Sequence, residues 1–244
     1  MRYSMDITVE ARHVDRYGRM TPAAILYLAQ EAAGAHCRLM GKDYDSLAQM
    51  GLFWAVSRHR VAVERLPRLD EAITVHTWPM PATRVAYPRA TELRDAQGHV
   101  LVKAVSLWVL MDVEKRAMVL PGKSGVDVPG MTTGEELEPP RSLAPRDRAG
   151  REVRQVTFSL LDRNGHMNNT HYLTWATDLL DSEFHGRHPA KGFTVCYLSE
   201  AREGQQVALS WELSGEENAL CVDAFRRGMN ATEERVFSVQ IYFE

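Results

Sequence analysis

The sequence predicts an α+β protein made of two similar units, each with one helix wrapped by an antiparallel sheet. A six-residue segment, DRYGRM at residues 15–20, recurs as DRNGHM at residues 162–167. Each copy leads into an apolar helical pattern and then into several strand-like segments, an order typical of α+β domains. Residues 121–150 are rich in Pro, Gly and charged residues and have no apolar period, which is typical of a linker. We therefore expect domains at residues 1–125 and 151–244, joined by a linker at residues 126–150.

The composition favours an ordinary globular protein. The 244 residues are 45% hydrophobic and 25% charged, which is enough apolar material for a sizeable core. A net charge of −3 argues against a nucleic-acid-binding protein. The three cysteines, Cys37, Cys196 and Cys221, form no CxxC pair, so we expect reduced thiols rather than a zinc or redox motif. Without a signal-peptide pattern or a run of about 18 apolar residues, we expect a cytoplasmic protein with no membrane span.

A helix is predicted directly after each copy of the repeat. In the first, Thr21 can cap the helix and Pro22 suits its first turn, where the missing N–H costs nothing. Residues 23–35 are apolar on nearly every face, so this helix must be surrounded by protein. In the second, the apolar residues at helical spacing are Tyr172, Trp175, Ala176, Leu179 and Leu180.

Strand-like segments follow each helix. After the first they lie at residues 54–57, 73–78, 84–87 and 100–111, with turns at residues 95–98 and 112–115. After the second they lie at residues 193–197, 207–211, 220–225 and 236–243. The order is the same in both halves, which supports the prediction of two similar units.

The two copies of the repeat differ in the side chains that could do chemistry. Tyr17 and Arg19 of the first copy become Asn164 and His166 in the second, beside the shared Asp162. A carboxylate, a carboxamide and an imidazole then stand just before a helix start with unpaired N–H groups. Thioester hydrolysis needs such parts, a base to activate water and donors for an oxyanion. Spacing alone favours a common turn followed by an Asn cap, whereas the clustering of these side chains and its absence from the first copy favour function.

Residues 161–175 (LDRNGHMNNTHYLTW) resemble the signature of acyl-ACP thioesterases, the bacterial relatives of the plant fatty-acyl-ACP enzymes. That family has an Asp-x-Asn-x-His-x-Asn-Asn segment at the helix of its second hotdog domain. Residues 15–18, Trp54 and residues 106–112 look like further family features, so the resemblance covers essentially the whole chain. It implies a tandem (double) hotdog fold and hydrolysis of fatty acyl-ACP, with much of the acyl chain held in the first domain.

Carried over onto this sequence, the resemblance implies catalytic roles for Asp162, Asn164 and His166, and for Glu200 in a downstream element. At position 201 the family has a cysteine, and this chain has Ala201, which argues against a covalent thiol mechanism. We expect Asn164 and helix-start amides to hold the thioester carbonyl. Glu200 or Asp162 would activate water, with His166 orienting or relaying the proton. Neither a metal nor a cofactor is implied.

Other readings of the sequence remain open. A hotdog thioesterase acting on acyl-CoA is the nearest alternative, and a non-catalytic acyl-binding hotdog protein is a second. No GxSxG, HExxH or strand-linked GxGxxG motif is present, which argues against a serine hydrolase, a zinc peptidase and a nucleotide cofactor. The expected partner is an acyl carrier protein bearing a fatty acyl chain, or acyl-CoA, and a homodimer is possible. Residues 25–35 and the strand around Trp54 could line an acyl tunnel or simply form core.

Overall fold

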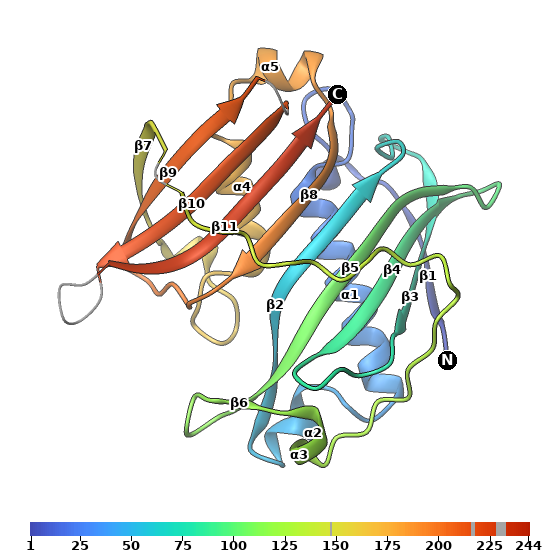
Figure 1. Cartoon of the computed structure of the whole chain (residues 1–244). Coiled ribbons are helices and arrows are strands. Elements are labelled where there is room, and N and C mark those ends of the chain that lie inside the picture. The colour runs from blue at the N-terminus through green and yellow to red at the C-terminus, as the bar shows by residue number, and fades with distance from the viewer. Residues whose placement is uncertain (147, 216–217, 228–232) are drawn as a thin grey trace. The chain divides into compact units, whose positions relative to one another are not determined.

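The computed structural model describes residues 1–146, 148–215, 218–227 and 233–244, and it divides into two compact units. Unit 1 comprises residues 1–140 and unit 2 residues 141–244. Figure 1 shows the same plan in each unit, a twisted antiparallel sheet with a main helix against one face. The predicted α+β class with one helix and one antiparallel sheet per unit is therefore confirmed.

Unit 1 contains a five-stranded sheet in the order β1-β3-β4-β5-β2, with the short β6 paired to β5. Its strands are β1 (Tyr3–Thr8), β2 (Leu52–Val63), β3 (Ala72–Pro79), β4 (Tyr87–Asp95), β5 (Val100–Asp112) and β6 (Met118–Val119). Its helices are η1 (Ala11–His13), α1 (Pro22–Leu39), α2 (Tyr44–Ala48) and α3 (Pro121–Ser124). Neighbouring strands pair antiparallel throughout.

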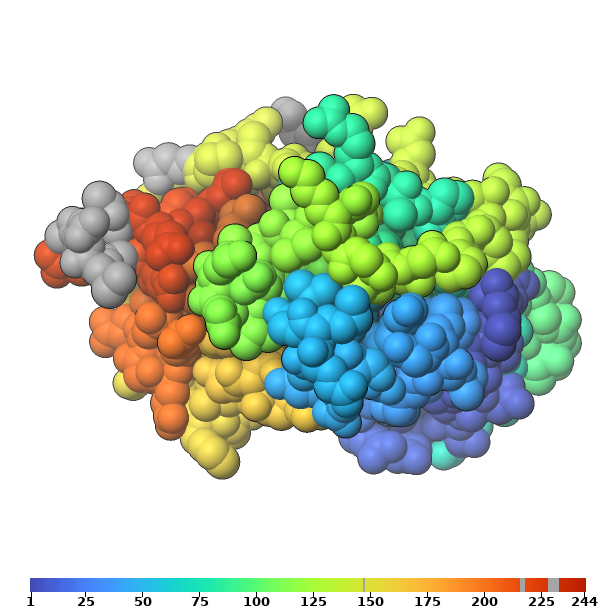
Figure 2. All heavy atoms as spheres, turned by 90° about the horizontal axis from the view of Figure 1, so that it is seen from below, coloured from blue at the N-terminus to red at the C-terminus, as the bar shows by residue number. Residues whose placement is uncertain are grey.

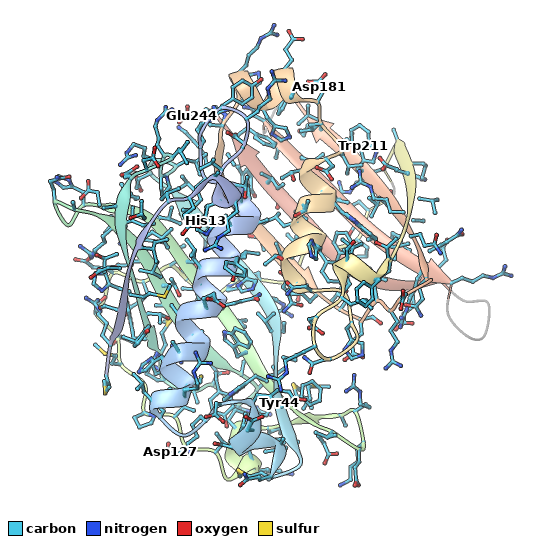
Figure 3. All side chains as sticks on the ribbon, turned by 180° about the vertical axis from the view of Figure 1, so that it is seen from behind. His13, Tyr44, Asp127, Asp181, Trp211 and Glu244 are labelled. Carbon is cyan, nitrogen blue, oxygen red and sulfur yellow. The ribbon has the colours of Figure 1, made fainter. Side chains whose placement is uncertain are left out.

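Helix α1 begins where the sequence predicts. The Thr21 hydroxyl accepts the N–H of Ala24 at 3.1 Å, and Pro22 occupies the first turn. Buried residues occur on most faces of α1, including Ile25, Leu26 and Ala32, each with an exposed fraction of 0%. Figure 3 shows α1 crossing the sheet of unit 1 from His13, near its start, toward Tyr44, beyond its end. The apolar character of residues 23–35 is thus explained by burial against the sheet.

Unit 2 repeats this architecture with a shorter helix. Its elements are β7 (Gly150–Gln155), η2 (Phe158–Leu160), α4 (Asn169–Thr177), α5 (Ser182–Arg187), β8 (Ala190–Tyr197), β9 (Gln206–Ser214), β10 (Ala219–Arg227) and β11 (Glu233–Phe243). The strand order, β7-β9-β10-β11-β8, matches that of unit 1 strand for strand. Tyr172, Trp175 and Ala176 form the buried face of α4 as predicted, whereas Leu179 and Leu180 lie beyond its end.

One predicted strand is wrong. Residues 84–86 lie in a loop, in which the Thr83 hydroxyl accepts the N–H groups of Val85 and Ala86. The strand instead starts at Tyr87 and continues to Asp95. Its polar residues, which include the buried Arg89 and Glu92, conceal the hydrophobic pattern of a core strand. The edge strands β1 and β7 are not predicted by the sequence pattern.

One end of the unit 1 sheet is closed by α2 and the segment after β5. Leu47, Leu52, Tyr87, Leu110 and Val126 form a buried cluster there, against which Trp54, Trp108, Val119 and Val128 pack. Figures 1 and 2 show α2 beside the chain that follows β5. Among the described residues, no helix is both long and apolar enough to span a bilayer.

Candidate functional site

The segment at residues 162–167 forms a tight turn. The N–H of Asp162 donates to the carbonyl of His166 at 2.8 Å, and the N–H of Gly165 donates to the carbonyl of Asp162 at 3.0 Å. The Asp162 carboxylate accepts the backbone N–H of Asn164 at 2.8 Å and that of His166 at 3.4 Å. Gly165 adopts a φ of 75°, a conformation that glycine tolerates best. The turn therefore determines where the side chains of Asn164 and His166 begin.

Unit 1 contains the same turn. Asp15 N–H donates to Arg19 O at 2.8 Å and Gly18 N–H donates to Asp15 O at 3.0 Å, with a φ of 69° at Gly18. The Asp15 carboxylate accepts the N–H groups of Tyr17 and Arg19 at 2.8 and 3.0 Å. Because the aspartate makes these contacts in both units, they account for its presence in both copies of the repeat. Holding the turn is one role of the Asp162 carboxylate.

His166 and Glu200 meet within unit 2. His166 Nε2 lies 2.9 Å from Glu200 Oε2, with side-chain exposed fractions of 15% and 41%. The backbone brings them together, because Met167 N–H donates to Ala201 O at 2.8 Å and so joins the turn to the residues after β8. Arg202 Nη2 lies 3.6 Å from the same Glu200 oxygen. An ionised Glu200 accepts from Nε2–H, which places a proton on that ring nitrogen.

The equivalent contact in unit 1 joins different side chains. Met20 N–H donates to Pro67 O at 2.8 Å, as Met167 N–H donates to Ala201 O. Arg19 and Leu66 thus occupy the positions that His166 and Glu200 occupy in unit 2. The carboxylate–imidazole pair is therefore present in unit 2, whereas unit 1 has an arginine and a leucine at the same two positions.

The start of α4 lies next to the turn. Asn168 Oδ1 accepts the N–H of Thr170 at 3.0 Å and its hydroxyl at 2.9 Å, so Asn168 caps the helix as the sequence suggests. One turn later, the buried Tyr172 hydroxyl accepts the N–H of Ala201 at 3.3 Å. Burial raises the pKa of Tyr172 to about 12, so this phenol keeps its proton at neutral pH. The helical spacing predicts Tyr172 only as a packing residue, and no local pattern indicates its contact with Ala201.

The structure thus connects all four predicted site residues, because the Asp162 carboxylate accepts the backbone N–H groups of Asn164 and His166, and the His166 side chain contacts Glu200. Asn164 lies exposed at the tip of the turn, and within the described chain only its backbone is engaged, through the Asp162 carboxylate. Its amide can therefore turn toward a ligand. No group of three or more potential metal-binding side chains occurs among the described residues.

Unit 1 contains a mainly apolar cavity of about 220 Å³. Its walls include Trp54, Tyr87 and Trp108, and one wall carries Arg89. The Arg89 guanidinium is buried, and its contacts are His36 Nδ1 at 3.1 Å, the Thr77 hydroxyl at 3.3 Å and Cys37 Sγ at 3.8 Å. The cavity therefore combines aromatic walls with a buried cation, as in many small-molecule pockets.

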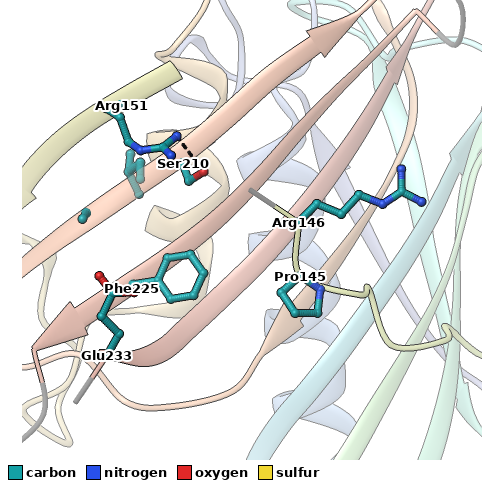
Figure 4. Close-up of a pocket in the computed structure, with 8 residues that line it drawn as sticks. Pro145, Arg146, Arg151, Ser210, Phe225 and Glu233 are labelled. Atoms are coloured by element: carbon teal, nitrogen blue, oxygen red, sulfur yellow. Dashed lines mark hydrogen bonds between the residues drawn. The ribbon is translucent and has the colours of Figure 1, made fainter. Parts of the chain in front are cut away.

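A second cavity, of about 380 Å³, lies in unit 2 between Pro145 and Arg146 and the strands behind them (Figure 4). Arg151 on β7 donates to the Ser210 hydroxyl at 3.1 Å on its wall, and Phe225 and Glu233 complete it. None of the four predicted site residues lines it. The candidate catalytic chemistry therefore lies elsewhere in unit 2, at the turn and Glu200.

Family models match both halves of the chain. The model described as acyl-ACP thioesterase N-terminal domain matches residues 1–120, and the C-terminal domain model matches residues 145–242. An oleoyl-acyl carrier protein thioesterase of Coriandrum sativum is 25% identical over 212 residues, which cover 77% of this chain and 56% of the relative. A palmitoyl-acyl carrier protein thioesterase of Arabidopsis thaliana is 28% identical, over 70% of this chain and 45% of the relative. The chain thus spans about half the length of these curated relatives.

Solved structures show the same fold. An acyl-ACP thioesterase from Bacteroides thetaiotaomicron matches with a TM-score of 0.88 at 23% identity, covering 100% of this chain and 98% of that one. The 12:0-ACP thioesterase from Umbellularia californica matches with a TM-score of 0.82 at 20% identity, covering 100% and 97%. These matches confirm the predicted tandem hotdog fold.

Proposed function

Because the chain belongs to the acyl-ACP thioesterase family, we propose that it hydrolyses fatty acyl-ACP to free fatty acid and the carrier thiol. The observation that carries this proposal is the 2.9 Å contact between His166 and Glu200, with the exposed Asn164 two residues before His166 in the same turn. Unit 1 conserves the backbone of this region but has Arg19 and Leu66 at the two positions. An acyl-binding protein would need the pocket alone, whereas hydrolysis needs a base and donors as well.

We propose Glu200 as the base that activates water. Its side chain is 41% exposed, so solvent can reach the carboxylate, and its Oε2 lies 2.9 Å from His166 Nε2. Asp162, the other carboxylate considered, accepts two backbone N–H groups of its own turn. Water attacks the thioester carbonyl carbon while Glu200 takes its proton, and the Asn164 amide donates to the developing oxyanion. The C–S bond then breaks, and the proton passes to the leaving thiolate.

A covalent route through position 201 has no support in this chain. Ala201 is fully buried, and its backbone contacts Met167 and Tyr172. Its methyl group offers no nucleophile, so direct attack by water is the proposed reaction.

We assign the acyl chain to unit 1 and the catalytic residues to unit 2. The cavity in unit 1 supports this assignment through its apolar aromatic walls, which suit a hydrocarbon chain. The domains at residues 1–125 and 151–244, with a linker between them, fit these roles. Residues 25–35 of α1 contribute both core side chains and, through Ala33, one wall of the cavity.

The proposal also covers the acyl carrier, the cellular compartment and the oligomeric state. The curated plant relatives are named for acyl carrier protein substrates, which favours acyl-ACP over acyl-CoA for this chain. Fatty acid biosynthesis supplies such substrates, and we propose the cytoplasm as the place of action. A homodimer is compatible with this activity and is not required by it.

Hydrolysis of a substrate panel tests the proposed function. Purified protein is given acyl-ACP and acyl-CoA substrates of several chain lengths, and free thiol and free fatty acid are measured. We expect turnover of acyl-ACP, its strong loss in Glu200→Gln, and full activity in Arg19→Ala, which alters the equivalent position in unit 1. Faster turnover of acyl-CoA would reassign the carrier. Binding of acyl substrates without hydrolysis would instead support a non-catalytic acyl-binding protein.

A further inference from the structure

A partly buried guanidinium contacts the main chain of Glu200. The residues between β8 and β9, which we call the Glu200 segment (residues 198–205), contact Arg226 of β10 at three places. Arg226 Nη1 donates to the carbonyl oxygen of Glu200 at 2.5 Å and to Gln205 Oε1 at 2.9 Å. Its Nη2 donates to the Ser199 hydroxyl at 2.8 Å. Arg226 therefore bridges the two ends of the segment and holds the main chain of Glu200 itself.

The guanidinium is itself held in place from β11. Arg226 Nε and Nη2 donate to Glu234 Oε2 at 3.1 and 2.9 Å, and the two residues are directly opposite in the β10–β11 pairing. The Ser199 hydroxyl donates to the other Glu234 oxygen at 2.6 Å. These bonds to Ser199 and Arg226 lower the pKa of Glu234, which keeps its carboxylate ionised. With a side-chain exposed fraction of 16%, Arg226 is largely shielded from water.

Unit 1 offers an internal comparison for this arrangement. Residues 64–71 make the same backbone contacts as the Glu200 segment. Glu64 and Arg65 both donate to Leu101 O, as Leu198 and Ser199 both donate to Val236 O. The N–H of Arg68 donates to the Glu71 carboxylate at 2.8 Å, and that of Arg202 donates to Gln205 Oε1 at 2.9 Å.

The guanidinium of unit 1 comes from a different place in the chain. Arg65 lies within the equivalent segment and donates to the Leu66 carbonyl at 3.4 Å and to both Glu71 oxygens at 2.9 and 2.6 Å. In unit 2 these positions hold Ser199 and Gln205, and Arg226 supplies the guanidinium from β10. Both units thus have a guanidinium bound to the equivalent carbonyl oxygen. In unit 2 this guanidinium comes from another strand, and the carbonyl is that of Glu200.

From this geometry we infer that Arg226 is a positioning residue for the reaction, holding the Glu200 main chain where its carboxylate meets His166. The inference rests on the proposed function, in which Glu200 activates water. Arg226 binds the carbonyl oxygen of Glu200, so it acts through the backbone. A planar guanidinium can bind Glu200 O, Gln205, Ser199 and Glu234 together, whereas a lysine ammonium has too few donors and the wrong shape.

The test compares Arg226→Gln with Arg65→Gln, which removes the equivalent guanidinium in unit 1. Steady-state kinetics on acyl-ACP, thermal unfolding and double-mutant cycles with Glu200→Gln are measured for both. We expect Arg226→Gln to lower kcat by on the order of tenfold with little change in KM, because the acyl-binding cavity is untouched. Once Glu200 is Gln, we expect the same change to have little further effect on kcat. Arg226→Lys should restore activity in part, and Arg65→Gln should change stability alone.

A second readout does not depend on turnover. The hydrogen-bonded Nε2–H proton of His166 is followed by NMR, and we expect its signal in the wild type and in Arg65→Gln but not in Arg226→Gln. If Arg226→Gln does not fold, Glu234→Gln takes its place, since Glu234 holds the guanidinium through two of its nitrogens.

Two results would overturn the inference. One is unchanged kcat and an intact His166 Nε2–H signal in a folded Arg226→Gln protein. The other is a loss of kcat that multiplies with the loss in Glu200→Gln, as expected of an independent, purely structural residue. A wild-type protein that hydrolyses none of the substrates would refute the proposed function, and the NMR signal would still decide the role of Arg226.

Discussion

His166 Nε2 lies 2.9 Å from Glu200 Oε2, although the two residues come from different loops of unit 2. The pairing of Met167 with Ala201 creates this proximity, and Arg226 holds the Glu200 carbonyl from behind. The contact is central to the proposed activity, because each partner is one residue away from this backbone pairing.

We expect Glu200→Gln to lower kcat for acyl-ACP by about a hundredfold or more, the range typical of lost general-base catalysis. The amide keeps the size of the side chain but cannot take a proton from water. Glu203→Gln, an exposed change in the same segment, is the matched control and should retain wild-type kcat. Equal rates for both variants would contradict the assignment of Glu200 as base.

Because the same turn occurs in both units, variants of its aspartate can distinguish a structural role from a catalytic one. Asp15→Ala removes the acceptor of two N–H groups in unit 1, and Asp162→Ala does so in unit 2. Each change should cost about 1–2 kcal/mol of unfolding free energy, because two partly exposed hydrogen bonds are lost. We expect kcat to fall in Asp162→Ala alone, since its turn carries Asn164 and His166. Denaturant unfolding and kinetics measure both effects, and an equal loss of kcat in Asp15→Ala would contradict the prediction.

Unit 1 should lose stability in mild acid because of His36. Burial, and then the nearby Arg89 cation, lower the pKa of His36 from an ordinary 6.5 to about 4. Below pH 6.5 the unfolded chain binds a proton that the folded chain does not, so the free energy of unfolding falls as the pH drops toward 4. A difference of this size corresponds to about 3 kcal/mol.

The buried His59, whose pKa burial lowers to about 3, acts in the same direction. Unfolding free energies from pH 7 to pH 4.5 should therefore fall less steeply in His36→Gln than in the wild type. Parallel curves for the two proteins would show that His36 does not contribute.

Widening the unit 1 cavity should change the acyl preference. Trp108 lines the cavity, and Trp108→Ala removes an aromatic wall, so the optimum should move toward longer chains with a small change in kcat. Trp211→Ala is the matched control, because Trp211 lies on β9 of unit 2 and outside the cavity (Figure 3). Competition between acyl-ACP substrates of different length gives the ratio of kcat/KM values. An unchanged ratio in Trp108→Ala would argue against this cavity as the acyl pocket.

Much of the fold could be predicted because its signals are local. The cap at Thr21 and the Asp–Gly turn each depend on neighbouring residues, and each is found as expected. The hydrophobic pattern does not locate strand β4, because Arg89 and Glu92 are buried polar residues. Their partners come from elsewhere in unit 1 or from the strand itself. A pattern of hydrophobicity cannot anticipate such partners.

The candidate site likewise combines local features with contacts between distant segments. The sequence by itself determined the turn at residues 162–167 and the cap at Asn168, because their hydrogen bonds close within a few residues. Resemblance to the family added Glu200 as a candidate but not its partner. Only the tertiary structure decided that Glu200 meets His166. The same holds for Arg226, which reaches the Glu200 carbonyl from another strand. Contacts between segments depend on strand pairing across the sheet, and local sequence does not encode that geometry.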